Sequence, residues 1–401
     1  MYTYIKETQT LVFNTNRDIF SFYLTHEDNM SVKHLIYNET EYIGPTQLAR
    51  MLLDLKLEDL IDIKVCINNP YYTSIDGIVY TKDGKIPVNR IGYTKGERTL
   101  VFCPVGKSHV KIPEGVEVIG RNAFTSVRLS TVIIPDSVKK INTAAFTDCK
   151  YLSDVELGSQ SQLTFIGDSA FNHCISLEKF TMPESLETLS DRAFARSSIK
   201  EITFPKNLID IGECIFAESG LQRIHIPKSH SQKIDCIEII KSCIDTDEEY
   251  PDNNSGNPSS SVLTIHIENL TPIVVPRYVY SDDIDELQDA ICKFIKTNST
   301  ENLVLYKYGS NLISKEDTAL EEYKLYASQQ ARRFLIRNVE HIAKRKAKEG
   351  EEQMLELVKL NIWGKTSLQK LLKIAEDMKY IAVISYLLDK IPKKKTTKMK
   401  L

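Results

Sequence analysis

The sequence predicts an α+β repeat protein, in which a solenoid with parallel strands is followed by a C-terminal α-helical domain. Three observations support this fold class. A phenylalanine recurs every 22 to 25 residues in the middle of the chain, and a short strand pattern, usually ending in proline, recurs at similar intervals. From residue 314 onward, apolar residues instead follow the spacing of amphipathic helices.

The repeat is counted most clearly on the phenylalanine, which follows an alanine in four units and an isoleucine in the fifth. These residues are Phe124, Phe146, Phe171, Phe194 and Phe216, at steps of 22, 25, 23 and 22. The strand segments are LSTVIIP from residue 129, LSDVELG from 152, LEKFTMP from 177, IKEITFP from 199 and LQRIHIP from 221. The longest step contains the polar insertion GSQSQLTF, residues 158–165, which a surface loop would tolerate. Because one unit cannot bury its own apolar side, successive units must stack.

Within each unit, apolar and polar residues alternate along the strand segment. Alternation turns one set inward, as with Val132 and Ile134, and leaves their neighbours outside. The block after each proline supplies a second inward set. We expect its glycines, Gly120, Gly167 and Gly212, to allow a turn with positive φ.

The composite unit VxxIGxxAFxxCxxLxxVxIP resembles the BspA-type leucine-rich repeat, also called the Treponema pallidum type. Five clear copies cover residues 116–227. Segments within 68–116 resemble the entry coils of that family, with an interruption at 85–98, and VLTIHIEN at 262–269 resembles one more strand. The resemblance implies a leucine-rich-repeat solenoid and a binding role, since many members act in adhesion or host contact. Cys149 and Cys174 occupy the family's cysteine position, where we expect core residues.

The segments outside the repeats suggest five regions. We expect an N-terminal capping region at 1–59, the solenoid at 60–270 with a surface loop at 246–261, a C-terminal cap or connector at 271–313, a helical domain at 314–392 and a basic tail at 393–401. The helical pattern PTQLARMLLDLKLEDL is placed to cover the open end of the solenoid. The polar, proline- and glycine-bearing stretch at 246–261 is typical of a loop.

Helix starts are predicted at two serines near the C-terminal side of the solenoid. Ser281 is followed by acidic residues, and Ser314 opens a Ser-x-x-Asp cap. The segment beginning at Ser314 is expected to carry an apolar face. That face contains Leu335, Ile336, Val339, Ile342 and Ala343.

Composition excludes several classes of function. The formal net charge of -3 gives no global attraction to nucleic acid, and the eight cysteines are scattered without a CxxC pair. We find no catalytic motif such as GxSxG, HExxH or a phosphate-binding glycine loop, so we expect no enzyme, no cofactor and no metal site. His173 and His225 lack other ligands at metal-binding spacing. Without an export signal or a transmembrane segment we expect a cytoplasmic protein, with a surface or non-classically secreted protein as the alternative.

The expected function is non-enzymatic binding or scaffolding of a protein or glycan partner through the outward face of the strand segments. A merely solvated face is the simpler alternative, since every solenoid sheet has an outward side. The residues predicted to form this face are Thr131, Ile133, Asp154, Glu156, Lys179, Thr181, Glu201, Thr203, Arg223 and His225.

A second hypothesis is a cytoplasmic regulator that contacts nucleic acid or its machinery. Four basic residues, Arg333, Arg337, His341 and Arg345, recur every four positions and would form a stripe on one helix, and lysines are concentrated after residue 392. Aromatic residues that could stack on bases are not interleaved with these charges. An ordinary solvated helix face and terminus explain the same pattern.

Overall fold

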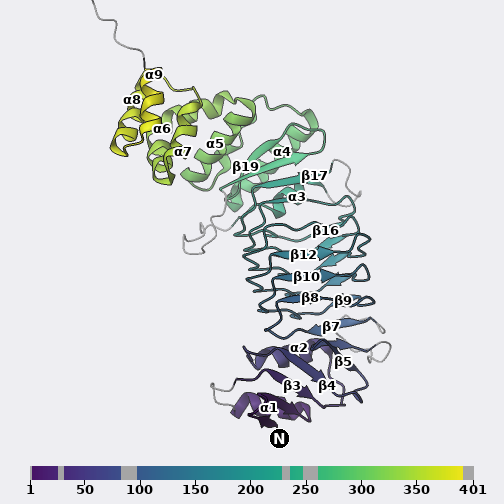
Figure 1. The fold of residues 1–401 in the computed structure, drawn as a ribbon. Helices are drawn as coiled ribbons and strands as arrows, with labels where there is room; N and C mark the ends of the chain where they lie inside the picture. Colours follow the sequence, from purple (N-terminus) through teal and green to yellow (C-terminus); the bar gives the residue numbers. More distant parts are fainter. Residues whose placement is uncertain (1, 26–30, 83–96, 228–234, 247–260, 392–401) are drawn as a thin grey trace, which may run out of the picture. The chain divides into compact units, whose positions relative to one another are not determined.

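The computed structural model describes residues 2–25, 31–82, 97–227, 235–246 and 261–391 (Figure 1). The chain divides into two compact units. The first runs to residue 245 and includes 265–269, and the second contains 261–264 and the residues from 270 onward.

The first unit begins with a four-stranded sheet in the order β1 (Thr3–Ile5), β2 (Thr10–Phe13), β3 (His34–Tyr37) and β4 (Asp62–Val65). The same region contains helices α1 (Asn16–Thr25) and α2 (Pro45–Asp54). Pro45 is the first residue of α2, as the helical pattern PTQLARMLLDLKLEDL predicts. The sheet extends past residue 59 because β4 pairs in parallel with β3. Its core also includes Val101 and Phe102 of the first solenoid coil, so this region covers the end of the solenoid.

The solenoid that follows carries two rows of short strands. The first row contains β5 (Tyr72–Ile75), β6 (Ile78–Thr81), β7 (Thr99–Phe102), β9 (Val118–Ile119), β11 (Lys140–Ile141), β13 (Phe165–Ile166), β14 (Thr188–Leu189) and β16 (Asp210–Ile211). The second contains β8 (His109–Lys111), β10 (Thr131–Ile134), β12 (Asp154–Leu157), β15 (Glu201–Thr203) and β17 (Arg223–Ile226). From β7 to β16 the first row pairs in parallel, as does each run of the second row. The parallel-strand solenoid predicted from the spacing is therefore confirmed, with helix α3 (Cys236–Ser242) after β17.

The second row is interrupted at residues 177–183, where the sequence predicts a strand and the structure assigns none among these described residues. The alternation persists, because Phe180 and Met182 are buried while Lys179 and Thr181 are exposed. The interruption follows the longest unit. Phe180 instead packs its ring against Phe171 and Phe194, with centroids 5.3 and 4.8 Å away.

The five repeat phenylalanines form a continuous stack through the solenoid. Neighbouring rings have centroid distances of 4.7, 4.9, 5.1 and 5.5 Å and interplanar angles of 10° or less. Backbone bonds run beside the rings: the N–H of Phe146 donates to the carbonyl of Ala170, and that of Phe171 to Ala193, each at 2.7 Å. All five side chains are fully buried. Ring stacking and backbone pairing therefore join the same pairs of coils.

The glycines of the repeat have a different role from the one predicted. Positive φ is not found at Gly120, Gly167 or Gly212. It occurs two residues before and after each phenylalanine, at φ between 52° and 63°, in the residues Asn122, Ser126, Ala144, Asp148, Ser169, His173, Arg192, Arg196, Cys214 and Glu218. A Cβ at Gly167 would lie 2.7 Å from the backbone nitrogen of Thr143. Glycine is required there because neighbouring coils approach closely.

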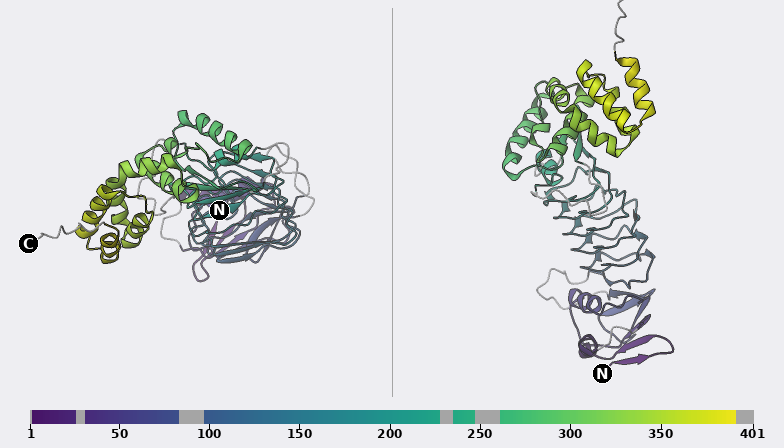
Figure 2. Two further views of the ribbon diagram at one scale, coloured as in Figure 1. Left: turned by 90° about the horizontal axis from the view of Figure 1, so that it is seen from above. Right: turned by 90° about the vertical axis from the view of Figure 1, so that its left-hand side faces the viewer.

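The second unit contains β19 (Ile273–Pro276) and a set of helices, shown in green to yellow in Figures 1 and 2. The helical elements are η1 (Ser281–Asp283), α4 (Ile284–Thr297), η2 (Tyr306–Tyr308), α5 (Leu312–Tyr326), α6 (Gln329–Glu349), α7 (Glu351–Lys359), α8 (Lys365–Asp377) and α9 (Ile381–Lys390). Strand β18 (Val262–Ile267), expected from its resemblance to the repeat strands, spans the boundary between the units. Among the described residues, no helix has both the length and the apolar composition needed to span a membrane.

The start of α5 differs from the prediction. Asn311, not Ser314, caps the helix, and its side chain accepts from the N–H of Ser314 at 2.9 Å. The helical segment then breaks at Ala327, which has φ 52°, and Ser328 caps α6. The predicted apolar face of α6 packs into the core of the second unit. Leu335, Val339, Ile342 and Ala343 are buried there and Ile336 is partly buried.

We expect Phe171→Ala to lower the free energy of unfolding by about 3–5 kcal/mol, because it leaves a cavity between two stacked rings. Chemical denaturation followed by circular dichroism measures the change. Tyr151→Ala is the control, since Tyr151 is 63% exposed on the neighbouring coil. Equal stability of the two variants would contradict a structural role for the stack.

Candidate functional site

Eight of the ten residues predicted for the binding face lie on strands of the second row, and Lys179 and Thr181 lie at its interruption; all ten point away from the core. Between them lie buried residues such as Val132, Ile202 and Ile224. Thr131 and His225 are half-buried, and the other members are exposed, namely Ile133, Asp154, Glu156, Lys179, Thr181, Glu201, Thr203 and Arg223. These ten residues are called the sheet face below.

Parallel pairing sets the order of side chains on the sheet face. Thr131 lies beside Asp154, and Ile133 beside Glu156, where β10 pairs with β12. Further along, β15 pairs with β17, which places Thr203 beside His225. Strands in such a row are about 4.8 Å apart, so neighbouring side chains are close enough for one partner to contact several of them.

A cluster of three charged or titratable groups occupies the β15–β17 end of the sheet face. His225 Nε2 lies 2.6 Å from Glu201 Oε1, and Arg223 Nε lies 3.5 Å from Glu201 Oε2. The sequence does not indicate this pairing, because His225 has no neighbouring cysteine or carboxylate set at ligand spacing. His173 likewise contacts Asp148, at 2.5 Å. In both cases the carboxylate comes from the preceding coil, which a linear spacing rule does not detect.

The sequence prediction missed His266, whose ring stacks on that of His225. The centroids are 4.7 Å apart and the interplanar angle is 20°. In β18, residues 265–267 continue the strand row after β17. The letters IHI occur at both 224–226 and 265–267, so the repeated triplet was a signal that could have placed the two histidines together.

The cluster alters the titration of its members. The hydrogen bond with His225 is the main cause that lowers the pKa of Glu201. Burial, followed by the charges of His225 and Arg223, lowers the pKa of His266, while Glu201 opposes this change. Glu201 therefore stays ionised, and His266 takes up a proton at lower pH than an ordinary histidine.

A hollow of about 340 Å³ lies next to the histidine pair. Phe204, Ile226 and Ile267 contribute apolar surface to it. Charged and polar residues also line it, namely Glu184, Thr203, Lys206, His225, His266 and Glu268. An apolar surface beside donors and acceptors of both charges can hold one side chain or one sugar ring of a larger partner.

Comparison with known proteins identifies the repeat. Residues 117–236 match the BspA type leucine rich repeat region in six copies. The middle of this chain is a BspA-type leucine-rich repeat region. No curated protein sequence matches the chain.

Solved structures similar to the chain include other leucine-rich repeat proteins. A Treponema pallidum leucine-rich repeat protein is 26% identical, with a TM-score of 0.29, over 32% of this chain and 63% of that protein. A leucine-rich cell surface protein from Faecalibacterium prausnitzii is 23% identical, with a TM-score of 0.34, over 59% of this chain and 52% of that one. This chain thus covers less than two thirds of either relative.

The repeat cysteines of the BspA-type region lie in its core. The thiol of Cys149 donates to the carbonyl of Phe124 at 2.9 Å, and that of Cys174 to Phe146 at 3.2 Å. Burial raises the pKa of Cys149 to about 12 and that of Cys174 well above its usual value, so both stay as thiols. Across the described ranges, no group of three or more histidine, cysteine or acidic residues is arranged to hold a metal ion.

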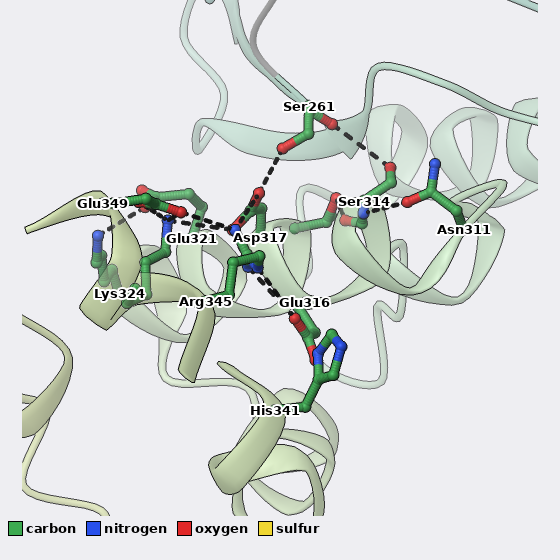
Figure 3. A network of polar contacts seen from close by, with 12 residues as sticks. Ser261, Asn311, Ser314, Glu316, Asp317, Glu321, Lys324, His341, Arg345 and Glu349 are labelled. Carbon is green, nitrogen blue, oxygen red and sulfur yellow. Dashed lines mark hydrogen bonds and ion pairs between the residues drawn. The ribbon is translucent and has the colours of Figure 1, made fainter. Parts of the chain in front are cut away.

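The four residues of the predicted basic stripe lie on α6 but differ in environment. Arg333 and Arg337 are exposed. Glu316, which is fully buried on α5, lies 2.7 Å from His341 Nδ1 and 3.3 Å from Arg345 Nη2. Figure 3 shows these side chains converging between the two helices. This end of the stripe is therefore committed to an internal ion-pair network.

Asp317 completes this network. It lies 2.6 Å from Arg345, and the hydroxyl of Ser261 donates to it at 2.7 Å (Figure 3). Lys346 Nζ lies 3.5 Å from it. Burial pushes the pKa of Asp317 upward, but Arg345 and Lys346 outweigh burial and hold it below its usual value. The guanidinium of Arg345 is thus not free to contact a phosphate backbone.

Glu322 is a buried acid that could suggest catalysis, since perturbed carboxyls often mark active sites. Its Oε1 accepts from the N–H groups of Leu305 and Tyr306, each at 2.7 Å. Burial outweighs these bonds and raises the pKa of Glu322 to about 8. It does not line the hollow beside the histidine pair, and its contacts join α5 to Leu305 and to Tyr306, the first residue of η2. In this structure its carboxylate accepts hydrogen bonds from backbone N–H groups of a neighbouring segment.

We expect His225→Gln to raise the pKa of His266 part of the way toward its ordinary 6.5, because burial remains and the charge of His225 is removed. NMR titration of the His266 ring measures this pKa in the wild type and in the variant. His173→Gln, in another coil, is the control and should leave His266 unchanged. If His225→Gln also leaves it unchanged, the two rings are not stacked in solution.

Glu322→Gln should stabilise the protein at alkaline pH. Folding raises the pKa from 4.5 to about 8, so the wild type loses stability as pH rises through this interval, while the unfolded carboxyl ionises first. The glutamine oxygen can still accept both N–H groups, so the advantage of the variant should grow with pH and vanish near pH 4.5. Thermal melts across this range test it. Glu321→Gln, whose carboxylate pairs with Lys324, is the matched control and should show no such trend.

Proposed function

We propose that this chain is a non-enzymatic binding or scaffold protein that recognises a protein or glycan partner through the sheet face. The observation that supports this proposal is the row of exposed polar side chains that runs along the second strand row and ends at the hollow. Repeat solenoids offer extended surfaces of this kind, to which each coil contributes a few side chains.

The chemistry of the sheet face favours recognition of side chains or sugar hydroxyls over tracking of a phosphate backbone. Asp154 and Glu156 are acidic, Lys179 is basic, and Glu201 is shared by Arg223 and His225. A phosphate polymer requires an excess of cations, which this mixture does not provide. The ion pairs around Glu201 are exposed, so a partner can replace them at small energetic cost.

The hollow gives the face a point where a partner can bury surface. Its apolar residues Phe204, Ile226 and Ile267 belong to the buried core of the solenoid. Anchor residues of protein partners commonly insert into such pockets, while the surrounding polar contacts set specificity. We therefore place the centre of the interface at the β15–β17 end.

Reversing two charges on the sheet face tests whether this face binds the partner. Lys179→Glu combined with Arg223→Glu should weaken binding by at least about tenfold, because both side chains lie on the proposed interface. Partners are first identified on protein and glycan arrays, and affinity for each is then measured by surface plasmon resonance.

The matched control is Glu187→Lys, an exposed residue beside β14 of the first strand row. It should leave the affinity unchanged. Equal losses from both rows would contradict the proposed face, and a loss only from Arg333→Glu with Arg337→Glu would move the interface to α6. Melting curves of each variant exclude unfolding as the cause.

A further inference from the structure

The hollow beside the histidine pair combines an apolar surface with two groups that can change their charge. His225 and His266 both line it, and their rings stack with a centroid distance of 4.7 Å. Phe204, Ile226 and Ile267 supply the apolar surface. Histidine is the side chain whose charge ordinarily changes in mildly acidic solution. The hollow can therefore gain positive charge as the pH falls.

The groups that face His266 favour its neutral form. Its ring stacks on His225 of β17, and that strand also carries Arg223. Burial, followed by the positive charges of these two residues, lowers the pKa of His266, and Glu201 of β15 opposes the change only in part. Strand β19, the other neighbour of β18 in this sheet, contains no titratable residue. The remaining charged residues of the hollow are Glu184, Lys206 and Glu268.

A side chain that fills the hollow would strengthen this preference. His266 is half-buried in the free protein, so part of its ring is still hydrated. An apolar anchor placed against Ile226 and Ile267 would remove more of that water, and loss of water disfavours the charged form of a histidine. Occupation of the hollow and protonation of His266 therefore oppose each other, and each weakens the other by the same factor.

We propose that the hollow takes an uncharged, apolar anchor side chain of a protein partner, and that acidification releases this anchor by protonating His266. The inference rests on the proposed function, because it concerns the same end of the sheet face. It adds the chemistry of the anchor and a control by pH. The apolar surface of the hollow favours such an anchor, because burying apolar area stabilises the complex without a charged partner.

The direction of the pH effect follows from proton linkage. Above the pKa of His266, which lies below the ordinary 6.5, the ring is neutral in both the free and the occupied protein. The affinity for the anchor is then independent of this group. Below that pKa the free protein carries a proton that must be lost on binding, so the affinity falls by up to about tenfold per pH unit.

An uncharged probe tests the hollow without a partner. N-acetyl-L-tryptophanamide presents one aromatic side chain and has no group that titrates in this range. Its affinity for the full chain is measured at about pH 7 and about pH 5 by NMR chemical-shift titration of the methyl groups of Ile226 and Ile267. We expect at least about fivefold weaker binding at the lower pH. His266→Phe keeps a ring beside His225 but cannot be protonated, so its affinity should change less than about twofold.

The matched control is His109→Phe. His109 is an exposed histidine on β8 of the same strand row, and it does not line the hollow. This variant should lose affinity at low pH as the wild type does. Lys179→Glu should behave in the same way, because Lys179 does not line the hollow either. Melting curves of each variant at both pH values exclude unfolding as the cause.

Three results would overturn the proposal. The first is that the probe does not perturb the two methyl groups at neutral pH, and the second is that the wild type binds it equally well at both pH values. The third is a loss at low pH that persists in His266→Phe, which would assign the effect to another group. Failure of the sheet face is seen separately, as a partner whose affinity does not depend on Lys179 and Arg223.

Discussion

Each repeat phenylalanine from Phe124 to Phe194 makes two contacts with the next coil: its ring stacks on the next ring, and its N–H donates to the carbonyl just before that ring. Both contacts require the coils to advance by a fixed distance. Residues in left-handed conformation two positions before and after the ring, and glycines that allow close approach of the backbones, serve the same requirement. The phenylalanine stack at the centre of the solenoid thus fixes the distance between coils. The same distance separates neighbouring strands on its surfaces.

The sheet face shows the consequence for function. Glu201, Arg223, His225 and His266 come from three different strands, yet they form one cluster because the strands are stacked in register. At the interrupted position, residues 177–183 keep their inward and outward directions without strand pairing. The buried residues therefore set the direction of the side chains in this solenoid. Backbone pairing in the second strand row contributes less to that direction.

The second unit is organised by buried charge as well as by apolar packing. Glu316 has no exposed surface. Its contacts with His341 and Arg345 compensate the cost of burying its carboxylate. Removing one member of such a network leaves an uncompensated buried charge, so these residues serve structure before recognition. Two arginines of the predicted stripe, Arg333 and Arg337, stay exposed.

The sequence alone was sufficient to predict the solenoid, its inward residues and the outward direction of the sheet face. The reason is that one local pattern repeats with a period of 22 to 25 residues. Helices α5 to α9 were also recognisable from apolar spacing, although Asn311 and Ala327 set boundaries that the pattern missed. Only the tertiary structure placed His266 against His225 and Glu316 against Arg345. Such pairs join residues 29 to 41 positions apart whose contact depends on how coils and helices stack, which no local pattern encodes.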